Sequence, residues 1–121
     1  GAPGLEQVYR ILAREGNWIK MVDIARVAIA WLRGGTYLDT DMEIGPRTFP
    51  EEDLRDGRAW LAVYPDGIAQ NHFIRAPPRH PFLAWLLRCF RVSALLEPHV
   101  VQATGPAAVS AALRIYLALA D

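Results

Sequence analysis

Two aspartates separated by one residue, Asp39 and Asp41, are the best candidates for chemistry in this chain. Because side chains on a strand alternate between its faces, an extended segment here puts Tyr37, Asp39 and Asp41 on one face and Leu38 on the other. The apolar face would pack on a core, and the acidic face would line a cleft. Two carboxylates this close repel each other, so a bound cation would stabilise them. Carboxylate oxygens suit Mg²⁺ or Mn²⁺, with phosphate oxygens completing the coordination.

A second pair of charged residues, Asp23 and Arg26, lies inside a long apolar run. The run over 18–33 has apolar residues on nearly every side of a helix, which is typical of a buried helix. Residues three apart lie on one helix face, so the carboxylate and the guanidinium are expected to be neighbours. They form either an internal ion pair that only satisfies itself or a part of a binding site. Gly34 and Gly35 then end the helix, one as its C′ residue and one where the backbone passes close to a neighbour.

The remaining elements follow from hydrophobic periodicity and turn signals. Two strands joined by the turn Pro65-Asp66-Gly67 are expected to pair antiparallel. An extended piece over 97–102 precedes Thr104, which would cap the last helix. The expected helices cover 5–14, 18–33, 82–96 and 107–120, and the paired strands cover 58–64 and 68–74. This order of elements predicts one α/β or α+β domain over residues 1–121.

The composition narrows the class of protein. Hydrophobic residues make up 52% of the 121-residue chain, so disorder is not expected. The formal net charge is zero, so nothing electrostatic favours nucleic acid or an anionic membrane as a partner. The sequence contains no charge-free apolar run long enough to span a bilayer and no visible signal peptide, so we expect a cytoplasmic location. Cys89 is the only cysteine and lies in an apolar run, which favours a small buried side chain.

Other protein classes that use aspartates at this spacing fit less well. A calcium loop that begins at Asp39 needs glycine at its sixth position and glutamate at its twelfth, where Ile44 and Pro50 stand. A haloacid-dehalogenase-type phosphatase wants Thr or Val two places after the second aspartate, where Glu43 stands. His72, alone in its strand, is more typical of a half-buried polar residue than of a metal ligand.

A third interpretation covers far more of the chain. The sequence resembles the DXD-containing, sugar-binding region of glycosyltransferase family 32 and of the related glucosylating bacterial toxins. A lone D-x-D would carry no weight, but several blocks occur in the same order with plausible gaps. The matching blocks are Asp23-x-x-Arg26, Gly34-Gly35-x-Tyr37-x-Asp39-x-Asp41, Asn71-His72-Phe73-Ile74, Pro77-x-x-His80-Pro81 and Thr104-Gly105-Pro106.

The resemblance implies an α/β fold of the GT-A type, a nucleotide-sugar donor and a divalent cation, Mn²⁺ or Mg²⁺. By position, Asp41 would be the main metal ligand, and Asp39 would contact the donor and also reach the metal through water. Asp23 and Arg26 would hold sugar hydroxyls and phosphates, since arginine stays charged and can donate two parallel hydrogen bonds to a pair of oxygens. Three further positions, Gly35, Tyr37 and Asn71, would also contact the nucleotide-sugar. No residue is assigned as the catalytic nucleophile.

The implied activity is hexosyl transfer from a nucleotide-sugar to an unknown glycan, lipid or protein acceptor. Few residues precede Asp23, so we expect the chain to be the central part of such an enzyme, truncated at both ends. The alternative is a non-catalytic binding domain derived from the same fold. Either way, we expect an exposed apolar patch beside the 18–33 helix, through which the chain would self-associate.

Overall fold

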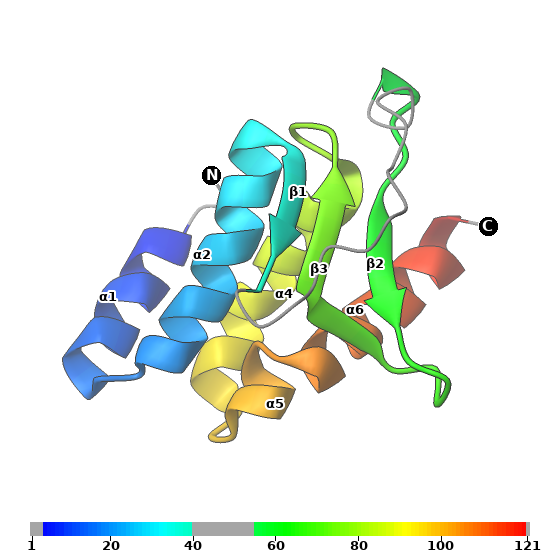
Figure 1. Cartoon of the computed structure of the whole chain (residues 1–121). Helices are drawn as coiled ribbons and strands as arrows, with labels where there is room; N and C mark the ends of the chain where they lie inside the picture. The colour runs from blue at the N-terminus through cyan, green and yellow to red at the C-terminus, as the bar shows by residue number, and fades with distance from the viewer. Residues whose placement is uncertain (1–3, 40–54, 121) are drawn as a thin grey trace.

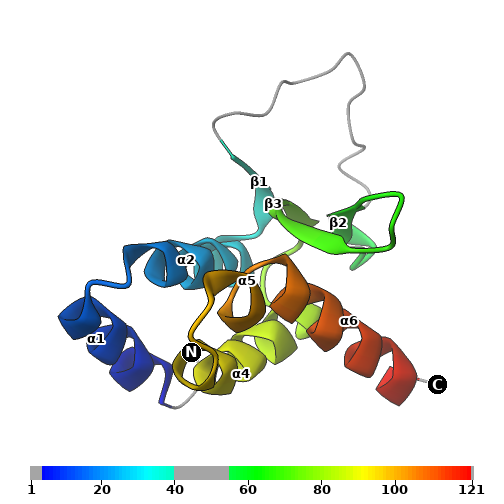
Figure 2. The same cartoon turned by 90° about the horizontal axis from the view of Figure 1, so that it is seen from below.

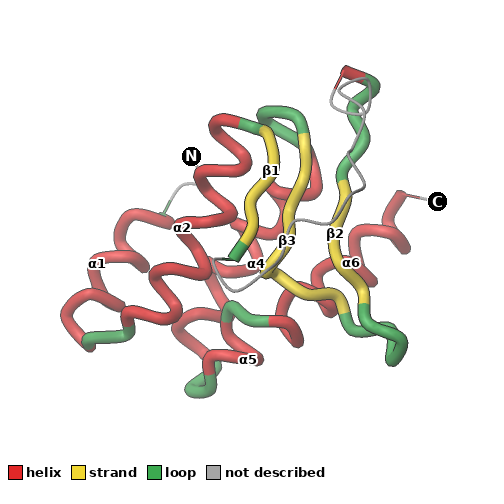
Figure 3. Tube along the Cα trace, in the orientation of Figure 1, coloured by secondary structure: helices red, strands yellow, loops and turns green. Residues whose placement is uncertain are grey.

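Helices cover one face of a three-stranded antiparallel sheet in the computed structural model, which describes residues 4–39 and 55–120 (Figures 1 and 2). Figure 3 separates the two layers by colour, with the strands side by side and the helices behind them. The helices are α1 (Leu5–Glu15), α2 (Trp18–Arg33), α4 (Pro81–Leu96), α5 (Val100–Ala103) and α6 (Pro106–Ala120), and the strands are β1 (Gly35–Leu38), β2 (Trp60–Val63) and β3 (Ala69–Ala76).

The strand β3 lies in the middle of the sheet, between β1 and β2, and both neighbours run antiparallel to it. Tyr37 of β1 and Leu61 of β2 both lie opposite Ile74. All three pack on the core formed with the helices. The expectation that Leu38 faces the core is therefore wrong, because the Tyr37 face of β1 is the one that the helices cover. The antiparallel pairing of the second and third strands is confirmed.

The central strand contains a bulge. Leu61 pairs with Ile74 and Val63 pairs with Ala69, so β2 advances by two residues while β3 advances by five. Extra residues in one strand break the ladder locally and turn side chains away from strict alternation. The bulged residues are 70–73, which include two of the polar side chains singled out in the sequence.

The helices confirm most of the expected boundaries. The core packs α2 against α4 and α4 against α6, with Ile24, Leu86 and Phe90 almost completely buried. Pro81 occupies the first turn of α4, and the His80 ring caps this helix, because its Nδ1 accepts a hydrogen bond from the Phe82 amide at 3.1 Å. Burial lowers the pKa of His80, and a backbone hydrogen bond to Gly57 opposes that shift.

Two expectations about helical structure fail. The segment predicted as extended over 97–102 contains α5, a single turn whose β-branched residues Val100 and Val101 favour strands in isolation. Contacts with α4 and α6 override that preference. The helix α2, expected to be buried nearly all round, is buried on one side only. The large apolar side chains exposed on its other side agree with the expected apolar patch beside this helix. In the part of the chain that the structure describes, every helix is too short or too polar to cross a membrane.

The two glycines after α2 have different roles. Gly34 has φ +70°, and a Cβ added there would lie 2.5 Å from Cδ of Pro78. Gly34 therefore provides both the C-cap of α2, at a positive φ with an extended ψ, and the close approach. Gly35 also has a positive φ, +100°, but a Cβ there would meet nothing within 4 Å. It pairs with Ala76 at the start of β1, at the other end of this strand from Asp39.

Candidate functional site

The guanidinium of Arg26 is the centre of a polar cluster between α2 and the sheet. Its Nη2 lies 3.5 Å from Oδ1 of Asp23, and its Nη1 lies 3.3 Å from Oδ1 of Asp39. Nη1 also donates to the carbonyl oxygen of Asn71 at 3.1 Å. The guanidinium carbon lies 5.0 Å from the centre of the Tyr37 ring, within the range of a cation–π contact. The predicted ion pair of α2 is thus one part of a larger arrangement.

Burial differs across this cluster. The side chains of Asp23 and Arg26 are 9% and 12% exposed, whereas that of Asp39 is 29% exposed. Asp39 therefore lies on the open side, where a ligand would arrive. One guanidinium faces two carboxylates, so the cluster has one negative charge in excess when both are ionised. Such an excess attracts a further cation or a hydrogen-bond donor.

Thr104 belongs to this site, although the sequence pattern assigned it another role. It is fully buried, and its hydroxyl donates to Oδ2 of Asp23 at 2.9 Å. Thr104 ends α5, and α6 begins two positions later at Pro106, so the expected cap of the last helix is wrong. Burial raises the pKa of Asp23, while the bond from Thr104, the charge of Arg26 and the Asn71 side chain favour the charged form. The bond joins residues 81 positions apart, so no local pattern could have predicted it.

Asn71, in the bulge of β3, contacts both charged helix residues, Asp23 and Arg26. Its backbone carbonyl accepts from Arg26, and its side-chain amide donates to the Thr104 carbonyl at 3.3 Å. The next residue, His72, uses its own carbonyl to accept from the Asp39 amide at 3.1 Å. The His72 ring does not join the cluster, because its Nε2 lies 3.1 Å from the hydroxyl of Tyr64.

Tyr37 orients Asp39. Its hydroxyl donates to Oδ1 of Asp39 at 2.6 Å, the same oxygen that faces Arg26. Burial raises the pKa of Tyr37, and the bond to Asp39 adds to the shift, so the phenol stays protonated and remains a donor. Tyr37 and Asp39 therefore lie close together, as their predicted shared face implies. Their side chains form a hydrogen bond there, and Tyr37 packs on the core.

The predicted metal ligands can be placed only in part. Asp41 lies outside the described residues. In the ranges 4–39 and 55–120, no group of three or more His, Cys, Asp or Glu side chains could hold a metal ion. Asp39 has the right oxygen chemistry and is partly exposed, and the cluster to which it belongs has one negative charge in excess, so this residue fits a shared role in binding a cation.

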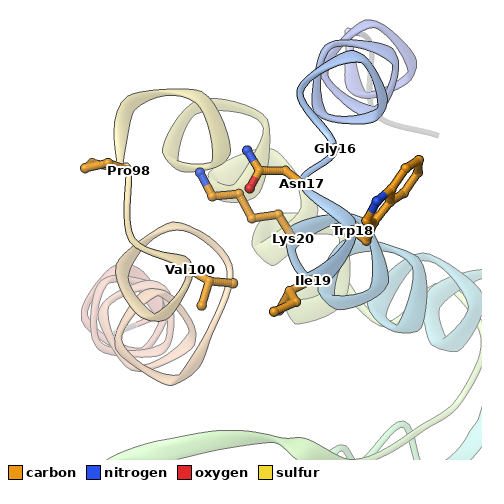
Figure 4. A pocket seen from close by; sticks show the side chains of 7 residues that line it. All are labelled: Gly16, Asn17, Trp18, Ile19, Lys20, Pro98 and Val100. Carbon is orange, nitrogen blue, oxygen red and sulfur yellow. The ribbon is translucent and has the colours of Figure 1, made fainter.

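A separate hollow of about 250 Å³ lies between the start of α2 and the start of α5 (Figure 4). Its lining includes Lys20 but no member of the Arg26 cluster. Lys20 is 4% exposed, and its ammonium donates to the carbonyls of Ala94 at 3.0 Å and Glu97 at 2.8 Å, at the end of α4. A buried cation at a helix C-terminus satisfies carbonyls that have no partner inside the helix. We therefore assign Lys20 to stability.

Comparisons with known proteins support one class. No family model matches the chain. Over 70 residues, 57% of the chain, it is 39% identical to the human alpha-1,4-N-acetylglucosaminyltransferase, and this stretch is 18% of that protein. The structure is similar to the PaToxG glycosyltransferase with a TM-score of 0.72 and 20% identity, covering 98% of this chain and 42% of that one. The chain thus spans less than half of each protein. The expected α/β fold, a partial GT-A-like fold, is confirmed, and the chain is similar to part of a glycosyltransferase in sequence and in structure.

Proposed function

We propose that this chain is the donor-binding core of a metal-dependent glycosyltransferase that transfers a hexosyl group from a nucleotide-sugar. The observation that carries the proposal is the position of Arg26, which touches residues from β1 and β3 while remaining 12% exposed. Three of the five sequence blocks that resemble family 32, those of Asp23, Asp39 and Asn71, meet at this one side chain, and a fourth reaches the cluster through the bond from Thr104 to Asp23.

The chemistry of Arg26 fits donor phosphates or sugar hydroxyls. It contacts each of its acceptors through a single nitrogen, and among the described residues Nη2 faces one acceptor whereas Nη1 faces two. A guanidinium held this way keeps donor capacity that a bidentate internal pair would use up. Asp23 and Asp39 would accept hydrogen bonds from hydroxyl groups of the donor, with Thr104 and Tyr37 fixing their carboxylates.

Gly35 and Asn71 remain proposed donor contacts, Asn71 because its backbone and side chain border the cluster. We also propose Asp41 as the main ligand of a divalent cation, Mn²⁺ or Mg²⁺, with Asp39 sharing it directly or through water. When bound, the cation would stabilise the charge that grows on the departing nucleoside diphosphate. The acceptor is proposed only by class, as a glycan, a lipid or a protein.

The test is calorimetric binding of a nucleoside diphosphate with Mn²⁺ to the 121-residue chain and to any longer form of the protein. Arg26→Gln should weaken binding about ten- to hundredfold, because a hydrogen bond to a charged group contributes about 1.5–3 kcal/mol. The matched control is Lys20→Met, which also removes a buried cation but lies outside the cluster. It should lower the melting temperature and leave the affinity unchanged. Unchanged affinity in Arg26→Gln would refute the donor role.

A second comparison tests the cation. Wild type should bind Mn²⁺ and the diphosphate together more tightly than either alone, and Asp41→Asn should lose this cooperativity. Equal binding by both proteins would remove Asp41 from the proposed role. Donor binding by a longer form without any release of free sugar in Mn²⁺ would favour the non-catalytic binding domain instead.

A further inference from the structure

The solvent face of α2 bears a continuous apolar stripe. Trp18, Val22, Ile29 and Leu32 are 63%, 52%, 61% and 50% exposed, and Ala25 lies between them. These five residues, here called the α2 stripe, follow one another at intervals of four, three, four and three residues. That spacing keeps them in one row along about 21 Å of the helix, and it is the spacing by which one helix packs on another. Trp18, at one end of the row, also borders the hollow near Lys20 (Figure 4).

The α2 stripe is symmetric about its middle. Ala25 is the small residue at the centre, with Val22 and Ile29 on either side of it and Trp18 and Leu32 at the ends. If a second α2 lies antiparallel with the two Ala25 residues facing each other, Val22 meets Ile29 and Trp18 meets Leu32. Each contact then occurs twice, as the two-fold symmetry of an isologous interface requires. The small central residue lets the two backbones approach closely.

Charges at the two ends of α2 agree with this orientation. Arg33, in the last turn, is exposed. Glu15, the last residue of α1, is also exposed and lies just before α2 begins. In an antiparallel pair the end of one α2 lies over the start of the other, so each Arg33 would lie near the partner's Glu15. A parallel pair would instead bring the two Arg33 side chains together, which is unfavourable.

We propose that the α2 stripe is the interface through which two copies of this chain form a two-fold dimer with antiparallel α2 helices. The symmetric order of large and small side chains and the opposite charges at the ends both select a second copy of this chain. The inference stands apart from the proposed function, since it uses residues outside the Arg26 cluster.

The first test measures association by sedimentation equilibrium of the 121-residue chain. Val22→Glu places two carboxylates in the apolar interface and should raise the dimer dissociation constant at least about tenfold. The matched control is Val92→Glu on α4, since Val92 is also 52% exposed. A surface change away from the interface should alter the constant no more than about twofold.

Two further variants test the orientation. Adding Ile29→Lys to Val22→Glu should restore the dimer, because each Glu would face the partner's Lys only in the antiparallel arrangement. In a Cys89→Ser background, Ala25→Cys should form a disulfide between copies on mild oxidation, since disulfides need Cα atoms about 4.4–6.8 Å apart. Val92→Cys in the same background should not.

Contrary outcomes are clear. Wild-type chain that stays monomeric up to about 100 µM would overturn the proposal, and a segment of a longer polypeptide would then be the better candidate to cover the stripe. A dimer that persists in Val22→Glu would place the interface elsewhere. Failure of both the charge-swap variant and the Ala25→Cys disulfide would overturn the antiparallel geometry.

Discussion

Replacing Thr104 by valine tests whether the buried carboxylate of Asp23 depends on its hydroxyl partner. Valine has nearly the same shape as threonine, so Thr104→Val removes the donated bond of 2.9 Å with little change in packing. The carboxylate would then keep the charge of Arg26 at 3.5 Å and the support of the Asn71 side chain, but it stays 9% exposed. Water can therefore replace the lost hydroxyl only poorly.

The expected magnitude depends on the charge of Asp23. A hydrogen bond to a charged group contributes about 1.5–3 kcal/mol, and a neutral one contributes about 0.5–1.5 kcal/mol. The loss on Thr104→Val should therefore be larger when Asp23 is ionised than when it is protonated, by about 1 kcal/mol. That difference corresponds to a further rise in the pKa of Asp23 in the variant.

The sign follows from linkage. Burial already raises the pKa of Asp23 in the folded state, so its contribution to stability is fully present at pH values below its unfolded pKa. That contribution is lost as the pH rises through the folded pKa. The variant raises the folded pKa further. The difference in the free energy of unfolding between wild type and Thr104→Val should thus increase as the pH rises. Because the other titrating groups are the same in both proteins, their contributions cancel in this difference.

Urea unfolding of both proteins from pH 4 to pH 8 measures this difference directly. Ser110→Ala is the control, because the Ser110 hydroxyl is also buried and its hydrogen-bond partners among the described residues are the uncharged amide and carbonyl of Ala69, at 2.8 and 3.3 Å. Its cost should not change with pH. A cost for Thr104→Val that is flat across this range, or below about 0.5 kcal/mol at neutral pH, would refute the link between Thr104 and the charge of Asp23.

Three further predictions concern stability. Lys20→Met should lower the free energy of unfolding by about 1–3 kcal/mol in urea titrations, because two carbonyls at the end of α4 lose their buried donor. Since burial lowers the pKa of His80, its neutral form supports the fold above the ordinary value of about 6.5, and this support is lost as the pH falls toward the folded pKa. His80→Asn, which keeps a capping acceptor that does not titrate, should flatten that dependence in melting curves from pH 4 to pH 8. Gly34→Ala should destabilise by about 1–3 kcal/mol more than Gly35→Ala in calorimetry, because only its Cβ would clash with Pro78.

The sequence predicted what depends on local periodicity. The boundaries of α2 and the pairing of Asp23 with Arg26 follow from helical spacing, and both agree with the structure. The resemblance assigned Asp39 to the same donor site, but local periodicity did not predict its direct contact with Arg26, because that contact depends on how β1 docks against α2. The bulge in β3 was also missed, since a bulge is a property of two paired strands and neither strand shows it alone.

Thr104 and α5 show a second limit. A threonine before Gly-Pro is a normal helix cap by local rules, and only the packing of α5 against the rest of the fold aims its hydroxyl at Asp23. The α2 stripe shows a third limit. Apolar residues around a helix predict burial, but they do not say whether this chain or another molecule covers them.

The long separation of the cluster's contacts has a consequence for folding kinetics. The bonds that order the site join residues 45 and 81 positions apart, and the Lys20 bond to the Glu97 carbonyl spans 77. Closing such loops costs entropy before any contact compensates for it, so these contacts are expected to form late. A nascent chain that ends before Thr104 would have the charged residues of α2 but no buried hydroxyl to hold Asp23. Ligand binding would then begin only after α5 docks, so the onset of binding would show that folding is complete.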